Sequence, residues 1–264
     1  MRVALRLGYV GEAYHGYQRQ PDRPTVEGEV IEALMDANLI TDPSSSGFKS
    51  ASRTDRGVSA VFQVISFDPL EPAVAICERV NSELPDDIFA LGWTEVREGF
   101  DPRRSAVSKT YIYLLQEDID PDSIRSRLVI FQGEHDFAQF SKPCGRRTVR
   151  SIEEVRFEPG KDRVFFTAKG FLWYQIRKII AAVQSMQKGE LDEKDVRRAL
   201  RGEAELSIQP APAEYLVLWR IEYGQVTIPV SRESERRAKE FLNRSMTSLE
   251  RRAAVRRTLL SAFS

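Results

Sequence analysis

The sequence predicts an α+β fold built from two similar α/β halves and a helical C-terminal extension. The chain of 264 residues is long enough for one large domain or two half-size ones. In both halves, segments with two-residue hydrophobic alternation are mixed with segments of helical period. Because strands and helices do not alternate regularly, the pattern argues against a doubly wound parallel sheet and favours a mainly antiparallel arrangement.

The first half opens with a strand at residues 2–10, in which Val3, Leu5 and Leu7 share one face. A polar loop then leads to a helix at 25–39, for which Thr25 is the expected N-cap. The elements expected next are a loop at 42–47, a strand at 61–67, a helix with Pro72 in its first turn that ends before Pro85, and strands at 88–97 and 107–116.

The second half repeats this mixture and is followed by the extension. Its expected elements are strands at 149–158, 163–169 and 216–224, and helices at 172–188 and 192–201, the shorter one capped by Asp192. The last 34 residues are also expected to be helical. We therefore divide the chain into residues 1–105, 106–228 and 229–264.

The composition excludes several classes of protein. A hydrophobic content of 42% with 30% charged residues is typical of a soluble globular protein. No apolar run approaches the roughly 20 residues that a membrane-spanning helix needs, and the alternating residues 1–7 are too short for a signal-peptide core. Cys77 and Cys144 lack the paired spacing of a zinc site or a disulfide framework. We expect a cytoplasmic protein without a membrane partner.

Other common catalytic motifs are missing from the sequence. His15 and His135 are too few and too isolated to predict a metal site. Ser52 has no His partner nearby in sequence, and Lys49 lacks the preceding glycines of a phosphate-binding loop. We expect neither a metal nor a nucleotide cofactor.

The charge is distributed unevenly along the chain. With 39 basic and 39 acidic residues the net charge is zero, yet residues 231–264 carry nine basic and four acidic side chains. The body is therefore acidic by five charges and the tail basic by five. RNA-binding proteins usually have a basic footprint. Local basic clusters are Arg53/Arg56, Arg103/Arg104/Lys109, Lys142/Arg146/Arg147/Arg150 and Arg177/Lys178, each of which can equally be solvated surface.

The segment Arg53–Gly57 can be interpreted in two ways. Asp followed closely by Gly is ordinary turn chemistry, which explains most such pentapeptides. However, Arg53 and Asp55 would project to the same side of an extended segment, where the guanidinium would lower the carboxyl pKa and keep it ionised. An ionised, oriented carboxylate is what covalent catalysis by Asp requires.

One helix also carries a residue that packing does not explain. Trp173 and Ile176 are expected in the core, next to Arg177 on an otherwise apolar helix. An unpaired buried arginine is costly, so Arg177 is expected to have a partner.

The ordered set of motifs resembles the tRNA pseudouridine synthase A family. The matching segments are Tyr9–Pro21, Thr25–Glu29, Ser52–Val58, Leu84–Ile88, Phe100–Arg103, Lys109–Tyr113, His135–Phe137, Thr148–Ile152, Gly170–Arg177 and Ala211–Leu216. Arg56 and Ser59 stand where many bacterial relatives have Ala and His, so the chain looks more like the archaeal branch. The resemblance implies the pseudouridine synthase fold, in which two halves share a central sheet flanked by helices.

The resemblance also implies roles for single residues. Asp55 would form a covalent adduct with the target nucleotide, Arg53 would hold Asp55 and help extrude the base, and Arg177 would pair with Asp55 from the opposite half. Tyr111 would stack on the uracil or assist loss of the C5 proton. The substrate-binding residues it implies are Arg56, Leu216, His15, Gln18, Arg103 and Lys109.

By this resemblance the substrate would be tRNA, modified at positions 38 to 40 of the anticodon stem-loop, and the enzyme would be a homodimer. Two alternatives stay open. One is the same chemistry on other RNA sites, and the other is a non-catalytic RNA-binding protein that keeps the scaffold.

Overall fold

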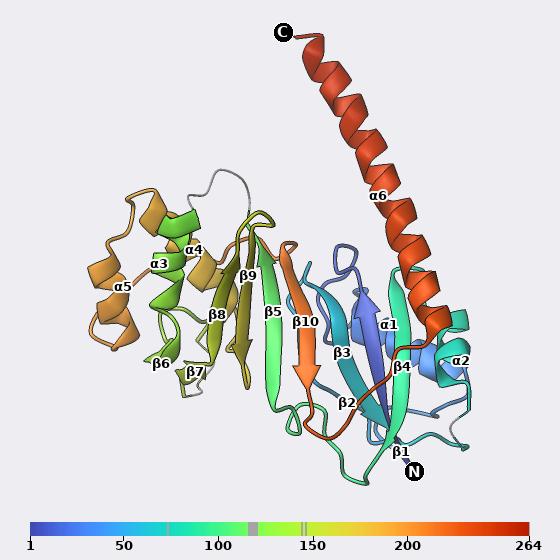
Figure 1. Ribbon diagram of the computed structural model, residues 1–264. Helices are drawn as coiled ribbons and strands as arrows, with labels where there is room; N and C mark the ends of the chain where they lie inside the picture. The colour runs from blue at the N-terminus through green and yellow to red at the C-terminus, as the bar shows by residue number, and fades with distance from the viewer. Residues whose placement is uncertain (73, 116–120, 144, 146, 264) are drawn as a thin grey trace.

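One sheet runs through both halves of the molecule. The computed structural model describes residues 1–264 except 73, 116–120, 144, 146 and 264, so Cys144 and Arg146 lie outside the described residues. The strands of the sheet are β1 (Arg2–Tyr9), β2 (Lys49–Ser50), β3 (Ser59–Phe67), β4 (Ile88–Val96), β5 (Ser108–Leu114), β8 (Glu154–Glu158), β9 (Arg163–Ala168) and β10 (Leu216–Glu222). Among the described residues their order is β4-β1-β3-β10-β5-β9-β8, with β2 paired to β3 (Figure 1).

The two halves meet where β10 lies between β3 and β5. The pairing of β10 with β3 is parallel, with Val217 opposite Ser59, whereas the other strand pairs of this sheet are antiparallel. Strand β3 also pairs with β1, which places Ala60 opposite Tyr9. The starts of β3 and β10 therefore lie at the same edge of the sheet, and so do the loops that precede them. The predicted α+β fold with a mainly antiparallel central sheet is confirmed.

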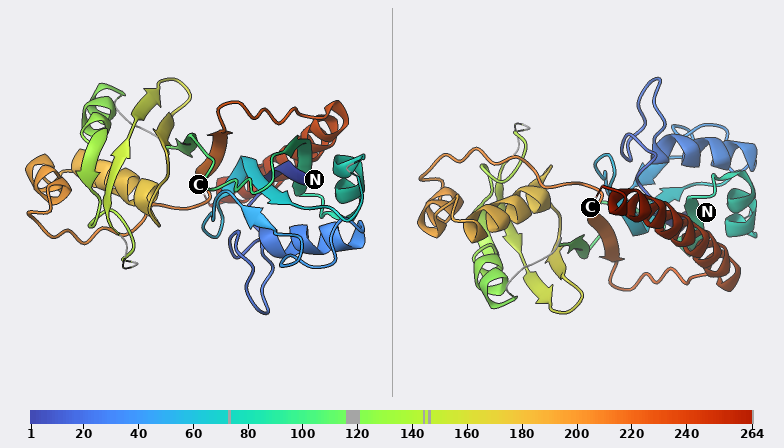
Figure 2. Two further views of the ribbon diagram at one scale, coloured as in Figure 1. Left: turned by 90° about the horizontal axis from the view of Figure 1, so that it is seen from below. Right: turned by 90° about the horizontal axis from the view of Figure 1, so that it is seen from above.

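Helices cover the sheet and extend beyond it. They are α1 (Val26–Asp36), α2 (Ile76–Glu83), α3 (Pro121–Val129), α4 (Gln175–Gln187), α5 (Glu193–Leu200) and α6 (Arg232–Ser261). Helices α1 and α4 lie on the same side of the sheet, behind it in the view of Figure 1 and visible from below and above in Figure 2. The predicted caps are present: Thr25 Oγ1 accepts a hydrogen bond from the Gly28 amide at 3.3 Å, and Asp192 accepts one from Lys194 at 2.8 Å.

Three expectations about the elements were wrong, and three elements were not predicted. The expected strand at 149–158 is two strands, because β7 (Val149–Ile152) pairs with β6 (Gly133–Asp136), whereas β8 pairs with β9. Helix α2 begins only at Ile76, after Pro72 and a left-handed Ala75. Helix α4 begins at Gln175 instead of 172, because Tyr174 is left-handed with φ 67°. Strands β2 and β6 and helix α3 were not predicted from the sequence.

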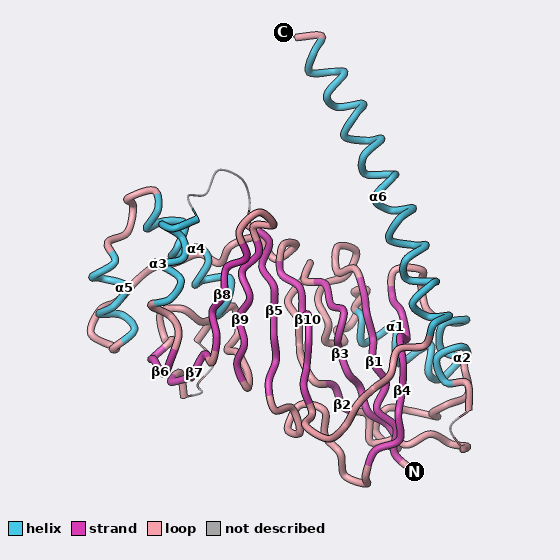
Figure 3. Tube along the Cα trace, viewed as in Figure 1, coloured by secondary structure: helices cyan, strands magenta, loops and turns pink. Residues whose placement is uncertain are grey.

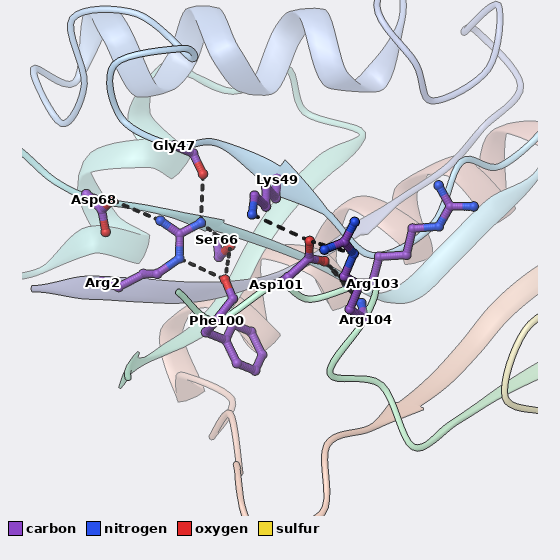
Figure 4. A network of polar contacts seen from close by, with 9 residues as sticks. All are labelled: Arg2, Gly47, Lys49, Ser66, Asp68, Phe100, Asp101, Arg103 and Arg104. Atoms are coloured by element: carbon purple, nitrogen blue, oxygen red, sulfur yellow. Dashed lines mark hydrogen bonds and ion pairs between the residues drawn. The ribbon is translucent and has the colours of Figure 1, made fainter. Parts of the chain in front are cut away.

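A buried arginine ties the start of β1 to three neighbouring segments (Figure 4). The Arg2 side chain donates to the Gly47 and Phe100 carbonyl oxygens, to Ser66 Oγ and to Asp68. These acceptors offset the cost of burying a guanidinium, which would be large without partners. The network fixes the edge of the sheet opposite the Asp55 segment.

Helix α6 begins on the body and then leaves it. Its first turns pack against β4 and α2, where Asn81 Nδ2 donates to Ser234 Oγ at 3.2 Å. The Phe89 and Phe241 rings also pack, with centroids 5.6 Å apart. Beyond Phe241 the helix projects away from the rest of the chain (Figures 1 and 3). The predicted helical extension is confirmed.

Among the described residues, no helix is both long and apolar enough to cross a bilayer.

Candidate active site

The loop that carries Asp55 ends in a tight turn. The Val58 amide donates to the Asp55 carbonyl oxygen at 3.1 Å, and Gly57 has φ 85°. A positive φ at the third turn position is typical of a type II turn and favours glycine there. We name residues 51–58 the Asp55 loop. The turn chemistry seen in the sequence is therefore present, and it leads directly into β3.

The N-terminal segment packs behind this loop and holds it by its backbone. A Cβ atom on Gly11 would lie 2.2 Å from the Val58 carbonyl oxygen, so only glycine allows this approach. Thr54 accepts a backbone hydrogen bond from Tyr17 at 3.1 Å, and its hydroxyl lies 2.8 Å from the Tyr9 hydroxyl. The glycines and tyrosines of residues 9–17 thus shape the support of the Asp55 loop.

Two buried polar side chains hold the other side of the loop. Gln63 forms a pair of hydrogen bonds with the backbone of Ser52, at 3.1 Å and 2.6 Å. Lys109 Nζ donates to the Ala51 carbonyl oxygen at 2.6 Å and to Ser52 Oγ at 3.1 Å. Lys109 is only 7% exposed, and burial lowers the pKa of its ammonium group to about 8. Strand β5 thus directs Lys109 beneath the loop, and its contact with substrate stays a prediction.

Asp55 is paired with an arginine from the second half of the chain. Arg177 Nη1 donates to Asp55 Oδ2 at 3.0 Å, and the two side chains are 13% and 16% exposed. Arg177 Nε also donates to the Ala211 carbonyl oxygen at 2.6 Å, which fixes the plane of the guanidinium. Residue 177 lies near the start of α4, which the left-handed Tyr174 allows to begin at this point. The ion pair predicted between the halves is confirmed.

The electrostatic balance at Asp55 differs from the one expected from the sequence. Burial raises the pKa of Asp55 above its usual value, and the hydrogen bond and charge of Arg177 offset this only in part. Arg53, the expected partner, is exposed and forms no ion pair with Asp55 in the described structure. The backbone turns after Asp55, where the Val58 amide donates to the Asp55 carbonyl oxygen.

Two residues beside Asp55 were not predicted to belong to the site. Trp173 was expected in the core but is 47% exposed, whereas Ile176 is buried as expected. The Lys142 ammonium lies 3.9 Å from the centre of the Trp173 ring, a cation–π contact. Both Trp173, by hydrogen bonding, and Lys142, by charge, lower the pKa of Asp55 and so oppose the effect of burial. No local signal separated Trp173 from this helix, because the helix was expected to begin at residue 172 and begins at Gln175.

Tyr111 and Leu216 are buried in the sheet where the halves meet. Tyr111 is 9% exposed and packs edge-to-face on Phe171, with ring centroids 5.4 Å apart. Burial raises the pKa of Tyr111 to about 12; a hydrogen bond to Ser52 lowers it and the charge of Asp55 raises it further. The phenol is therefore neutral at physiological pH. Leu216 is buried at the start of β10, at the same edge as the Asp55 loop.

An open pocket of about 600 Å³ lies beside the ion pair. Its lining residues come from both halves: Glu12, Arg56, Gly57, Arg177, Pro212, Ala213 and Glu214. Asp55 lies next to this pocket, since it forms an ion pair with Arg177, one of the lining residues. The structure thus brings together a buried carboxylate, two arginines and an opening at the junction of the halves.

The remaining predicted substrate-binding residues lie in different surroundings. Gln18 is exposed and His15 half-buried in the loop after β1, where His15 Nδ1 has no hydrogen-bond partner among the described residues. Arg103 is exposed in a turn whose amide groups donate to Asp101 (Figure 4). No contact of these three side chains with Asp55 is present among the described residues, and their roles stay predictions.

Comparison with known proteins identifies the family. The family model described as tRNA pseudouridine synthase matches residues 128–224. A tRNA pseudouridine synthase A of Thermococcus kodakarensis is 44% identical over 228 residues, which cover 84% of this chain and 85% of that protein. A tRNA pseudouridine synthase A of Thermococcus gammatolerans is 40% identical over 260 residues, covering 97% of each. The chain belongs to the tRNA pseudouridine synthase family. Membership confirms the predicted enzyme class, an isomerase.

Similarity to solved structures is more distant. A crystal structure of a pseudouridylate synthase is 12% identical with a TM-score of 0.40, covering 89% of this chain and 72% of that one. Assignment to the tRNA pseudouridine synthase family therefore depends on the sequence relatives. Within the described part of the chain, no group of three or more His, Cys, Asp or Glu side chains is arranged to hold a metal ion.

The raised pKa of Asp55 predicts the acid limb of the pH–rate profile. If the synthase needs the ionised carboxylate, kcat/KM should fall on acidification with an apparent pKa above 3.8, the ordinary value for Asp. The raised pKa also makes stability depend on pH, because folded Asp55 holds its proton to a higher pH than the unfolded chain does. The free energy of unfolding therefore falls as the pH rises from 3.8 through the titration of folded Asp55. The measurement is kcat/KM against pH, with circular dichroism as the control for folding. A limb at or below the ordinary value would contradict this role.

Proposed function

We propose that this synthase converts uridine to pseudouridine at positions 38 to 40 of the tRNA anticodon stem-loop, with Asp55 as the nucleophile. The observation that carries the proposal is the nearly buried Asp55 carboxylate, ion-paired to Arg177 beside a pocket lined by both halves. A carboxylate held in one orientation is suited to covalent catalysis. Relatives named tRNA pseudouridine synthase A over most of the chain support tRNA as the substrate.

The reaction is an isomerisation and balances without a redox partner. Asp55 attacks the target nucleotide, at C6 of the base or at C1′ of the ribose, and the N1–C1′ bond breaks. The base turns in the pocket, C5 bonds to C1′, the C5 proton is lost, and N1 gains a proton. Release of the adduct returns the Asp55 carboxylate. Arg177 keeps this carboxylate oriented and, by its charge, favours the ionised form that attacks.

Residues around the pocket have the types that a flipped nucleotide needs. A base must leave its stack before its C5 and C6 edge is accessible, which costs a few kcal/mol. Stacking on an aromatic ring returns roughly 1–3 kcal/mol per base. Tyr111 is the candidate stacking residue at the junction of the halves, and its neutral phenol can serve as a hydrogen-bond donor. Arg56 lines the opening, where it can meet phosphate groups of the substrate.

The proposal extends to assembly and location. A homodimer would let the modest basic patches of two acidic bodies act together on one tRNA. A cytoplasmic location fits an enzyme whose substrate is tRNA. Sedimentation of the full chain with and without tRNA tests the dimer, and a monomer on RNA would contradict it.

Site mapping tests the proposed substrate position. Unmodified tRNA transcripts with uridine at position 38, 39 or 40 are incubated with the synthase, and pseudouridine is located by carbodiimide labelling and reverse transcription. Transcripts with cytidine at the same position are the matched controls. We expect modification at these uridines and none in the controls. Pseudouridine only at other positions would support the alternative of the same chemistry elsewhere, and bound but unmodified RNA would support a non-catalytic binding protein.

A further inference from the structure

The distal part of α6 stands at the same edge of the sheet as the Asp55 loop. Arg237, near the base of the helix, donates to the Leu84 carbonyl oxygen and lies 3.7 Å from Asp86, just ahead of β4. The first residue of β4, Ile88, pairs with Tyr9, and Tyr9 pairs with Ala60 at the start of β3. We name residues 242–263 the arm. At 1.5 Å per residue it extends about 30 Å beyond the body. In the view from above in Figure 2, it is directed towards the middle of the molecule.

The arm carries unneutralised positive charge. It contains five arginines and one acidic residue, Glu250, so its net charge is +4 on a chain whose net charge is zero. In the first turns of α6 three basic side chains are paired: Arg236 with Glu233, Arg237 with Asp86 and Lys239 with Glu235. Within the described structure, none of the five arm arginines forms an ion pair, and all five are exposed. The arm therefore gives a chain with an acidic body a surface suited to a polyanion.

One face of the arm holds only groups that can donate hydrogen bonds. The side chains that share a shallow surface are Asn243, Arg244, Thr247, Ser248, Arg251 and Arg252. This spacing repeats every three or four residues, so the six side chains form one stripe without a carboxylate. Arg244 and Arg251 are about 10 Å apart along the axis. Guanidinium, hydroxyl and amide groups in such a row match the oxygens of a phosphodiester backbone.

We propose that this donor face of the arm binds the phosphodiester backbone of the substrate RNA beside the nucleotide held at Asp55. The inference depends on the proposed action on tRNA, and it adds a recognition surface that lies outside the pocket. It also explains how an acidic body can attract RNA, because the basic residues are concentrated on one projecting helix. A second copy of the chain is the weaker candidate for the opposite, apolar stripe of Leu242, Met246 and Leu249, since two paired arms would bring +4 against +4.

The test removes the charges of the donor face in the full-length protein. The variant R244Q/R251Q/R252Q is compared with the wild type for its Kd with unmodified tRNA at several salt concentrations. Loss of three phosphate contacts should weaken binding about 10- to 100-fold at physiological salt and reduce the slope of log K against log salt by about 2–3. The kcat at saturating tRNA should be unchanged. An unchanged Kd and slope would overturn the inference.

The matched control replaces the apolar stripe in the same helix. The variant L242S/M246S/L249S also changes three exposed residues, and its tRNA affinity should equal that of the wild type. If it loses affinity together with a fall in sedimenting mass, the arm acts by self-association and the inference is overturned. Binding needs no catalysis, so arm-dependent binding without pseudouridine would refute only the proposed function. Normal pseudouridine formation with tRNA binding that does not depend on the arm would refute only the proposed role of the arm.

Discussion

Asp55→Asn should abolish tritium release from C5-labelled uridine RNA, with a loss of kcat on the order of 10³-fold or more. An amide has nearly the shape of the carboxylate but cannot act as the nucleophile. It can still accept the hydrogen bond that Arg177 donates at 3.0 Å, so the fold and the pocket should persist. The measurement is tritium release at saturating RNA, together with Kd for the same RNA, which should change little.

Glu214→Gln supplies the matched control for this substitution. It makes the same change of carboxylate to amide at an exposed position of the same pocket, where the side chain is not paired with Arg177. Tritium release should stay within a few-fold of the wild type. Undiminished release by the Asp55 variant would remove Asp55 from its proposed role. Equal losses in both variants would mean that the charge of the pocket matters and not this one nucleophile.

Arg177→Met should have the next largest effect, and the size of the loss should depend on pH. Without the guanidinium, the factor that chiefly offsets the burial of Asp55 is gone, so the pKa of Asp55 should rise further. At neutral pH, kcat/KM should fall by roughly 10²–10³-fold, because less carboxylate is ionised and its orientation is lost. Part of the activity should return as the pH is raised. The measurement is the pH profile of kcat/KM for the variant and the wild type.

Two further substitutions separate charge from geometry at Arg177. Arg177→Lys keeps the charge, but it cannot bond both Asp55 and the Ala211 carbonyl oxygen through a planar fork, so its activity should be intermediate. Arg197→Met, which removes an exposed arginine paired with Glu193 on α5, should leave the profile unchanged. A parallel loss at every pH in the Met variant would contradict the electrostatic role and indicate a structural one.

The sequence by itself determined the features that depend on neighbouring residues. The turn at Asp55 follows from the local chemistry of Asp and Gly57, and the caps at Thr25 and Asp192 follow from side chains that bond amide groups two or three residues ahead. The mainly antiparallel sheet and the long C-terminal helix were also predicted, because hydrophobic period is a local signal. The Asp55–Arg177 pair was predicted only through family resemblance, since no local signal joins residues in different halves.

Tertiary structure alone decided which groups surround the carboxylate. Lys109 was predicted to contact substrate, yet strand register turns it beneath the Asp55 loop. Trp173 is large and apolar like a core residue, yet its side chain is exposed. Because Tyr174 is left-handed, α4 begins only at Gln175 and Trp173 lies outside it. The pKa of Asp55 was expected to fall beside Arg53, but burial raises it and Arg177 is the partner. The burial of a residue and its long-range partners both depend on segments far apart in sequence, and only the folded chain brings those segments together.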